Sequence, residues 1–163
     1  MKILDLFCGI GGLSLGFEDA GFEVISAIDI WPDAIKTFNH NRINKVGCVI
    51  PIEQYNETLL LDIVKQNKIT GIIGGPPCQG FSTVGRRDID DPRNQLYLEF
   101  YKAVKIANPD FFVIENVRGI ITSNNGYAYG IENGINLVDT AYSYHANNLS
   151  GKGNCEEYLG NFL

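Results

Sequence analysis

The stretch Lys2-Ile-Leu-Asp-Leu-Phe-Cys-Gly-Ile-Gly-Gly-Leu13 decides the fold of this 163-residue chain. Its first six residues are mostly apolar and predict a buried strand, and the glycines that follow predict a tight turn. The next segment, from Leu13 to Ala20, predicts a helix that ends at Gly21. A buried strand, a glycine-rich turn and a helix are the usual opening unit of a parallel α/β sheet.

Further strands alternate with helices along the chain. We expect strands at 22–30, 45–52, 69–75 and 111–114, and helices at 32–40, 57–68 and 93–107. Because helical crossovers join parallel strands, this order predicts a doubly wound, mostly parallel α/β domain over residues 1–120. Residues 121–163 are rich in Asn, Gly, Tyr and Ser, show weak periodicity, and are left as an unassigned C-terminal extension.

The composition limits the class of protein. Hydrophobic residues make up 45% of the chain and charged residues 20%, which is typical of a soluble globular domain. No apolar run approaches the roughly 18 residues that a membrane helix needs, and the first residues lack the form of a signal peptide, so we expect a cytoplasmic protein. The net charge of −6 argues against a free-standing nucleic-acid binder.

The cysteines are widely spaced and form no Cys-x-x-Cys pair, and the chain has only two histidines. We therefore expect no metal site and no disulfide framework. In a reducing compartment the cysteines are free thiols. They are Cys8, Cys48, Cys78 and Cys155.

Cys78 lies in the rigid turn Gly-Gly-Pro-Pro-Cys-Gln-Gly-Phe-Ser (74–82), directly after the apolar run 69–73. Pro76 and Pro77 fix two φ angles and remove two amide donors, so the segment cannot continue a central strand. Open α/β sheets bind ligands at the carboxyl ends of their strands. A free cysteine is most often buried and inert, but this turn favours an accessible, nucleophilic thiol.

The glycine turn after the first strand favours a nucleotide-like ligand. Gly9 and Gly11 match the first two glycines of the dinucleotide fingerprint, but Ser14 replaces the third, which disfavours a nicotinamide cofactor. Asp29, 18 positions after Gly11, ends the second predicted strand and is placed to accept hydrogen bonds from ribose hydroxyls. The turn could instead serve strand-to-helix packing alone, and Asp29 could be an ordinary helix-start residue before Trp31.

Glu115 follows the fifth predicted strand, so we expect its carboxyl group at the same sheet edge as Cys78. A glutamate at a strand end is often simply exposed to solvent. A thiol beside a carboxylic acid, however, suits thiolate addition to a pyrimidine ring, with the acid stabilising a ring nitrogen.

Four motifs in order resemble those of the DNA (cytosine-5)-methyltransferases: residues 5–12, 75–82, 91–94 and 115–117. The resemblance covers residues 1–120 and implies a Rossmann-like methyltransferase fold with S-adenosylmethionine as cofactor. It implies that the substrate is double-stranded DNA with a flipped cytosine, in an enzyme of restriction–modification type. Family members continue past this length with a Gln-x-Arg-x-Arg strand and a target-recognition region. We therefore expect a truncated copy or one part of a split enzyme, with a second chain as a possible partner.

The resemblance also implies roles for individual residues. Cys78 would attack carbon 6 of cytosine, and Glu115 would hold or protonate N3. The expected DNA contacts are Ser82, Arg86 and Arg87, although a solvated loop is the other interpretation of the arginines. The expected cofactor-binding residues are Phe7, Gly9, Gly11, Asp29, Ile30, Asp62, Pro77 and Leu96. Asp62 is assigned to the adenine amino group because Pro51-Ile52-Glu53 stands where the family has an aspartate.

Two other functions stay open at this stage. The chain could be a catalytically silent module that binds S-adenosylmethionine or another protein. It could also be a cytosine-5 methyltransferase that acts on transfer RNA, as one branch of the family does. The motif Gln-Gly-Phe-Ser (79–82) looks more like the DNA branch.

Overall fold

The computed structural model describes residues 1–77, 96–116 and 138–139 of the chain. These residues form one parallel sheet with the strand order β3-β2-β1-β4-β5-β6. Its strands are β1 (Lys2–Leu6), β2 (Glu23–Asp29), β3 (Gly47–Val49), β4 (Gly71–Gly74), β5 (Phe111–Glu115) and β6 (Val138–Asp139). The parallel sheet and its alternation with helices confirm the predicted doubly wound α/β fold.

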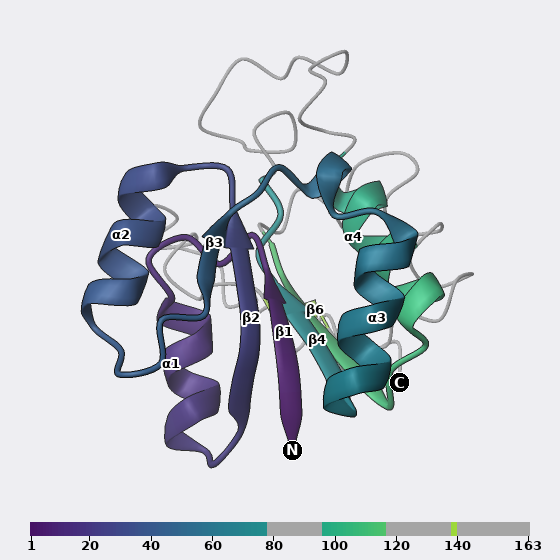
Figure 1. Cartoon of the computed structure of the whole chain (residues 1–163), viewed down its shortest axis with the longest axis horizontal. Coiled ribbons are helices and arrows are strands. Elements are labelled where there is room, and N and C mark those ends of the chain that lie inside the picture. The colour runs from purple at the N-terminus through teal and green to yellow at the C-terminus, as the bar shows by residue number, and fades with distance from the viewer. Residues whose placement is uncertain (78–95, 117–137, 140–163) are drawn as a thin grey trace, which may run out of the picture.

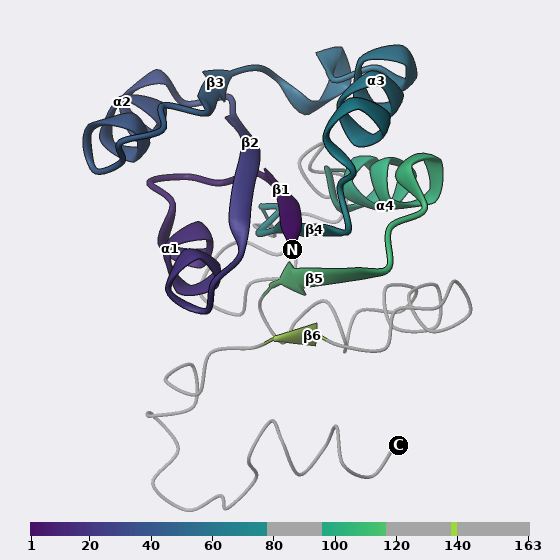
Figure 2. The same ribbon diagram turned by 60° about the horizontal axis from the view of Figure 1, so that its bottom comes forward.

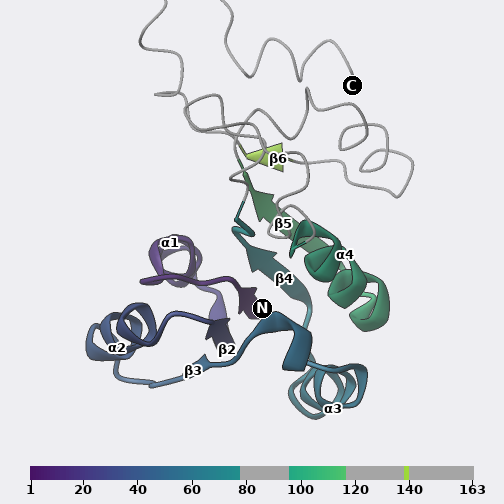
Figure 3. The ribbon, with the colours of Figure 1, turned by 90° about the horizontal axis from the view of Figure 1, so that it is seen from above.

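Helices cover both faces of the sheet. Figure 3 shows α1 (Gly12–Asp19) and α2 (Pro32–His40) on one face, and α3 (Glu57–Asn67) and α4 (Leu96–Ala107) on the other. A short 3-10 turn, η1 (Ile52–Gln54), joins β3 to α3. No helix in the described ranges is both long and apolar enough to cross a bilayer.

Each face of the sheet has its own apolar core, because side chains alternate along every strand. On β4, Ile72 packs with Leu60 and Phe100 from α3 and α4, whereas Ile73 packs with Phe38 from α2. All five side chains are at most 1% exposed. Burial of each such side chain stabilises the fold by roughly 1.5–3 kcal/mol, so the sheet is anchored on both faces.

The boundaries differ from the predicted ones at a few points. The third strand is shorter than predicted, because Pro51 has no amide to donate and η1 begins at Ile52. Sequence analysis did not predict β6. This strand lies in the unassigned segment 121–163 and pairs with β5 through Ile114 and Val138 (Figure 2). A two-residue strand carries no readable periodicity. The division of the chain at residue 120 stays a prediction.

The strand order reverses between β1 and β4, at the centre of the sheet (Figure 1). The register pairs Leu6 with Gly74, so the chain leaves these two strands side by side at the carboxyl edge. A Cβ atom on Gly74 would lie 1.9 Å from the carbonyl oxygen of Leu6, so only glycine permits this approach. Open α/β sheets bind their ligands at such a switch point.

Candidate active site

The loop after β1 turns sharply and contains three residues with left-handed backbone. Phe7, Gly9 and Gly11 have φ angles of 66°, 54° and 90°. Glycine adopts this conformation freely, but a phenylalanine there stores strain of roughly 1–3 kcal/mol, which proteins tend to tolerate at functional sites. The amide of Gly11 donates to the carbonyl oxygen of Cys8 at 2.8 Å and closes the turn.

Asp29 ties this loop to the end of β2. Its Oδ2 accepts a hydrogen bond from the amide of Gly9 at 2.8 Å, and its Oδ1 accepts one from the amide of Trp31 at 2.8 Å. The carboxylate therefore holds the glycine loop. It also holds the start of α2, which agrees with the alternative interpretation of Asp29 as a helix-start residue. A carboxylate oxygen has a second lone pair, so these two bonds leave acceptor capacity for a ribose hydroxyl, and that contact stays a prediction.

The start of α1 leaves backbone amides for a ligand or solvent. Gly11 is the N-cap residue of α1 and supplies no side-chain acceptor to the first amides of the helix. Such amides attract carboxylate or phosphate groups. Ile30, at the rim of the same edge, is 68% exposed. The loop thus offers polar surface, and Ile30 apolar surface, at this edge of the sheet.

Ser14 replaces the third fingerprint glycine for a structural reason. It is fully buried, and its Oγ donates to Oδ2 of Asp5 at 2.5 Å. Asp5 is also fully buried, and its Oδ1 has no hydrogen-bond partner among the described residues. Burial raises the pKa of Asp5 to about 7, although the bond from Ser14 opposes this rise. A glycine at position 14 would leave both carboxyl oxygens unsatisfied.

The described ranges contain two cysteines, one buried and one exposed. Cys8 is buried, and desolvation raises the pKa of its thiol far above the usual range. Cys48 is exposed at the edge strand β3. Burial thus excludes Cys8 as the candidate nucleophile.

Glu115 lies beside the turn that leads to Cys78. A Cβ atom built on Gly75 would be 3.1 Å from Oε2 of Glu115, so the carboxyl group lies over the backbone of that glycine. Asn116 is buried, and its Nδ2 donates to the carbonyl oxygen of Pro76 at 3.0 Å. The ends of β4 and β5 therefore meet, as expected, at one edge of the sheet. Cys78 lies outside the described residues, so its distance from Glu115 stays a prediction.

The other predicted site residues lie at different depths and on different elements. Pro77 is half-buried directly after β4, and Leu96 is half-buried at the first turn of α4. Asp62 is exposed on α3, on the face of the sheet opposite α1 and α2. The predicted DNA contacts Ser82, Arg86 and Arg87 lie outside the described residues.

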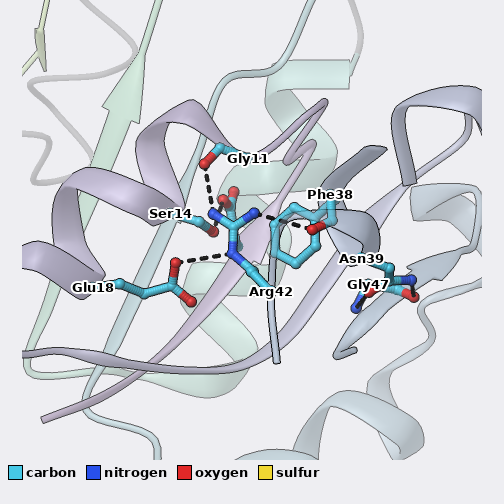
Figure 4. Close-up of polar contacts among 8 residues, drawn as sticks. Gly11, Ser14, Glu18, Phe38, Asn39, Arg42 and Gly47 are labelled. Atoms are coloured by element: carbon cyan, nitrogen blue, oxygen red, sulfur yellow. Dashed lines mark hydrogen bonds and ion pairs between the residues drawn. The ribbon is translucent and has the colours of Figure 1, made fainter. Parts of the chain in front are cut away.

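Sequence reasoning missed two residues that hold this edge together. Arg42, between α2 and β3, donates to the carbonyl oxygen of Gly11 (Figure 4). Arg42 belongs to none of the four motifs, so its position in the sequence did not mark it as a site residue. Asn116 was quoted within a motif but was given no role. Across the ranges that the structure describes, no group of three or more His, Cys, Asp or Glu side chains is arranged to hold a metal ion.

A doubly wound parallel sheet with a strained glycine loop at its switch point makes this chain a Rossmann-like α/β protein. Residues 1–147 match the family described as C-5 cytosine-specific DNA methylase. The chain belongs to this family.

Curated relatives agree with this assignment. Type II methyltransferase M1.HphI of Haemophilus parahaemolyticus is 41% identical over 129 residues, which are 77% of this chain and 35% of that protein. Type II methyltransferase M.HgiGI of Herpetosiphon aurantiacus is 43% identical over 117 residues, which are 72% of this chain and 90% of that protein. The chain spans about a third of the length of several of its curated relatives.

Solved structures confirm the fold. A putative DNA modification methyltransferase encoded within an Escherichia coli prophage superposes with a TM-score of 0.69 at 39% identity, over 82% of this chain and 37% of that one. A mutant of DNMT2 from Spodoptera frugiperda superposes with a TM-score of 0.62 at 28% identity, over 83% of this chain and 41% of that one. The fold is that of Rossmann-like methyltransferases, as the sequence predicted.

Proposed function

We propose that this chain carries the cofactor-binding and catalytic part of a cytoplasmic DNA (cytosine-5)-methyltransferase of restriction–modification type. Its cofactor would be S-adenosylmethionine, and its substrate a cytosine flipped out of double-stranded DNA. The observation that carries the proposal is the position of the Glu115 carboxyl group over Gly75, three residues before Cys78. The family to which the chain belongs supports the same chemistry.

The residues after β1 and β2 fit the cofactor. Asp29 presents a half-buried carboxylate to ribose hydroxyls, and the exposed side chain of Ile30 offers apolar surface to adenine. The first amides of α1 suit the cofactor's carboxylate. When bound, S-adenosylmethionine supplies the electrophilic methyl group that carbon 5 of cytosine takes up. Asp62, Pro77 and Leu96 remain proposed contacts.

The protein's own part in the reaction is nucleophilic and acid–base catalysis. The Cys78 thiolate forms a bond to carbon 6 while Glu115 donates a proton to N3, so electron density moves to carbon 5. After methylation, carbon 5 loses its proton to a base, the carbon–sulfur bond breaks, and N3 returns its proton to Glu115. The thiol and the carboxylic acid are thus regenerated once Cys78 regains a proton.

DNA is favoured over transfer RNA as the substrate. The family description and the prophage structure both name DNA as what those proteins modify. Ser82, Arg86 and Arg87 are the proposed DNA contacts, and the arginines would neutralise phosphates. A target-recognition region, elsewhere in the same protein or on a second chain, would read the bases.

Covalent trapping tests the proposal. The chain is incubated with S-adenosylmethionine and duplex DNA in which every cytosine is replaced by 5-fluorocytosine, so that the unknown target sequence is represented. Because fluorine at carbon 5 cannot leave as a proton does, the enzyme stays bonded to DNA and shifts on a denaturing gel. We expect an adduct with the wild-type chain and with Cys48→Ser, which removes an exposed thiol, but none with Cys78→Ser.

Glu115→Gln should slow adduct formation by about 10²-fold or more, the contribution of a positioned general acid. Each reaction is repeated with added chains that carry a Gln-x-Arg-x-Arg motif. Binding of S-adenosylmethionine in calorimetry, without an adduct under either condition, would instead assign the chain to the silent class of cofactor-binding modules.

A further inference from the structure

Arg42 uses its whole guanidinium group to connect three parts of the chain. Its Nη2 donates to the carbonyl oxygen of Gly11 at 2.7 Å, and its Nε donates to Oε2 of Glu18 at 2.9 Å (Figure 4). Its Nη1 donates to the carbonyl oxygen of Phe38 at 3.3 Å, and its Cζ lies 3.8 Å from the centroid of the Phe38 ring. The glycine loop, α1 and α2 are therefore fixed to one another through a single side chain.

The Arg42 guanidinium group is largely shielded from solvent, and its charge is balanced by a neighbouring carboxylate. The Arg42 side chain is only 8% exposed, and the Glu18 carboxylate beside it neutralises its charge. A buried arginine without such a partner would be strongly destabilising. Its charge also lies near Asp5 and lowers the pKa of that carboxyl group, against the larger effect of burial.

The packing against Gly11 is as close as a glycine allows. A Cβ atom at this position would lie 2.5 Å from Nη1 of Arg42 and 2.5 Å from Cδ2 of Phe38. The same position has φ 90°, which also favours glycine. Direct contact with Arg42 and Phe38 thus explains why the second position of the motif is a glycine.

Holding the carbonyl group of Gly11 also orients the next amide. A peptide group is planar and trans, so its C=O and its N–H point in opposite directions. The carbonyl oxygen of Gly11 accepts from Arg42 and from the amide of Leu15 at 3.0 Å, which directs it along α1. The amide of Gly12, in the same peptide, is then directed away from the helix, toward the edge where β1 ends.

We propose that Arg42 is a positioning residue, which holds the Gly11–Gly12 peptide in the orientation that cofactor binding requires. The identity of the bound group rests on the proposed function, whereas the ordering of the loop does not. Lysine cannot replace arginine fully here, because an ammonium group cannot reach all three acceptors in the fixed geometry of a guanidinium.

The test compares Arg42→Met, Arg42→Lys and Glu18→Gln with the wild-type chain. The Met variant keeps an apolar side chain on Phe38 and loses every hydrogen bond. The Lys variant keeps the charge. The Gln variant leaves the donor to Gly11 in place and keeps an acceptor for Nε, but it removes the charge that balances Arg42, so it measures the general loss of stability caused by an unbalanced buried charge.

Two measurements are made on the whole chain. Amide hydrogen exchange without ligand should speed up about 10-fold or more in residues 8–13 of Arg42→Met, with β4 unchanged. The affinity for S-adenosylmethionine, measured by calorimetry and by fluorescence of Trp31, the single tryptophan of the chain, should fall about 10-fold or more. Arg42→Lys should give values between those of Arg42→Met and the wild-type chain. Glu18→Gln should speed up exchange in residues 8–13 and in β4 to a similar extent and lower the affinity less than Arg42→Met does, because it weakens the whole domain while Arg42 still donates to Gly11.

The outcomes separate the two proposals. Wild-type exchange rates at 8–13 in both Arg42 variants would overturn the positioning role, and so would faster exchange throughout β4, which would indicate a general loss of stability. If the Met variant does not fold, the Lys variant decides by the same criteria. A wild-type chain that fails to bind S-adenosylmethionine would refute the proposed function, while the exchange rates would still decide whether Arg42 orders the loop.

Discussion

The buried carboxyl group of Asp5 should make the stability of the folded chain depend on pH. Asp5 has a pKa of about 7 in the folded chain, mainly because burial disfavours its charged form, compared with 3.8 in an unfolded peptide. Between these values the folded chain keeps a proton that the unfolded chain has lost. The folded state binds more protons, so the free energy of unfolding decreases as pH rises from about 4 to about 7.

The magnitude follows from the two pKa values. A shift of about 3 pKa units corresponds to about 4 kcal/mol in total. At pH 5 the unfolded chain is already mostly ionised, so part of this loss has occurred. Between pH 5 and pH 8 the remaining loss from Asp5 is about 2 to 3 kcal/mol.

Asp5→Asn isolates this effect, because asparagine has nearly the same shape, can accept the bond from Ser14 and does not ionise. Urea unfolding of both chains at pH 5 and pH 8 gives the difference in stability at each pH. We expect this difference to shift in favour of the variant by about 2 to 3 kcal/mol between pH 5 and pH 8. Asp33→Asn, at an exposed position on α2, is the control and should show little shift. A difference for Asp5→Asn that does not change with pH would refute the reasoning.

Two further substitutions test contacts at the carboxyl edge. Asp29→Ala should lower the free energy of unfolding by about 2 kcal/mol and also weaken S-adenosylmethionine binding in calorimetry, because two amides lose a charged acceptor. Cys78→Ser is the control and should change neither quantity. Unchanged stability in Asp29→Ala would exclude a structural role for these bonds. Gly74→Ala should destabilise the chain by about 3 kcal/mol in urea unfolding, because its Cβ meets backbone. Gly16→Ala, which meets nothing within 4 Å, should be neutral or slightly stabilising, and equal losses in both variants would contradict the steric explanation.

Much of the fold was readable from local patterns. The strand-turn-helix unit at the N-terminus, the alternation of apolar segments with helices, and the breaks at Pro32 and Gly21 gave the parallel sheet and its helices. The family followed from ordered motifs, and the comparisons confirm it. These features are local in sequence, so periodicity and turn chemistry suffice to predict them.

The contacts that shape the edge were not readable, because they join residues far apart in the chain. Arg42 reaches Gly11 across 31 positions, and Asn116 reaches Pro76 across 40. In the sequence, Ser14 was only a departure from the glycine motif. In the structure, its hydroxyl group satisfies one carboxyl oxygen of the buried Asp5. The left-handed backbone of Phe7 is likewise set by its surroundings and not by its residue type.

The hydrogen bond from Asn116 to the carbonyl oxygen of Pro76 has a mechanical consequence. Any displacement of the prolyl turn must carry the end of β5 with it or break this bond, and Asn116, which is 2% exposed, has little access to water as a substitute partner. We therefore expect the ends of β4 and β5 to move together. Because Glu115 directly precedes Asn116, this bond also ties the position of the acid to that of the prolyl turn.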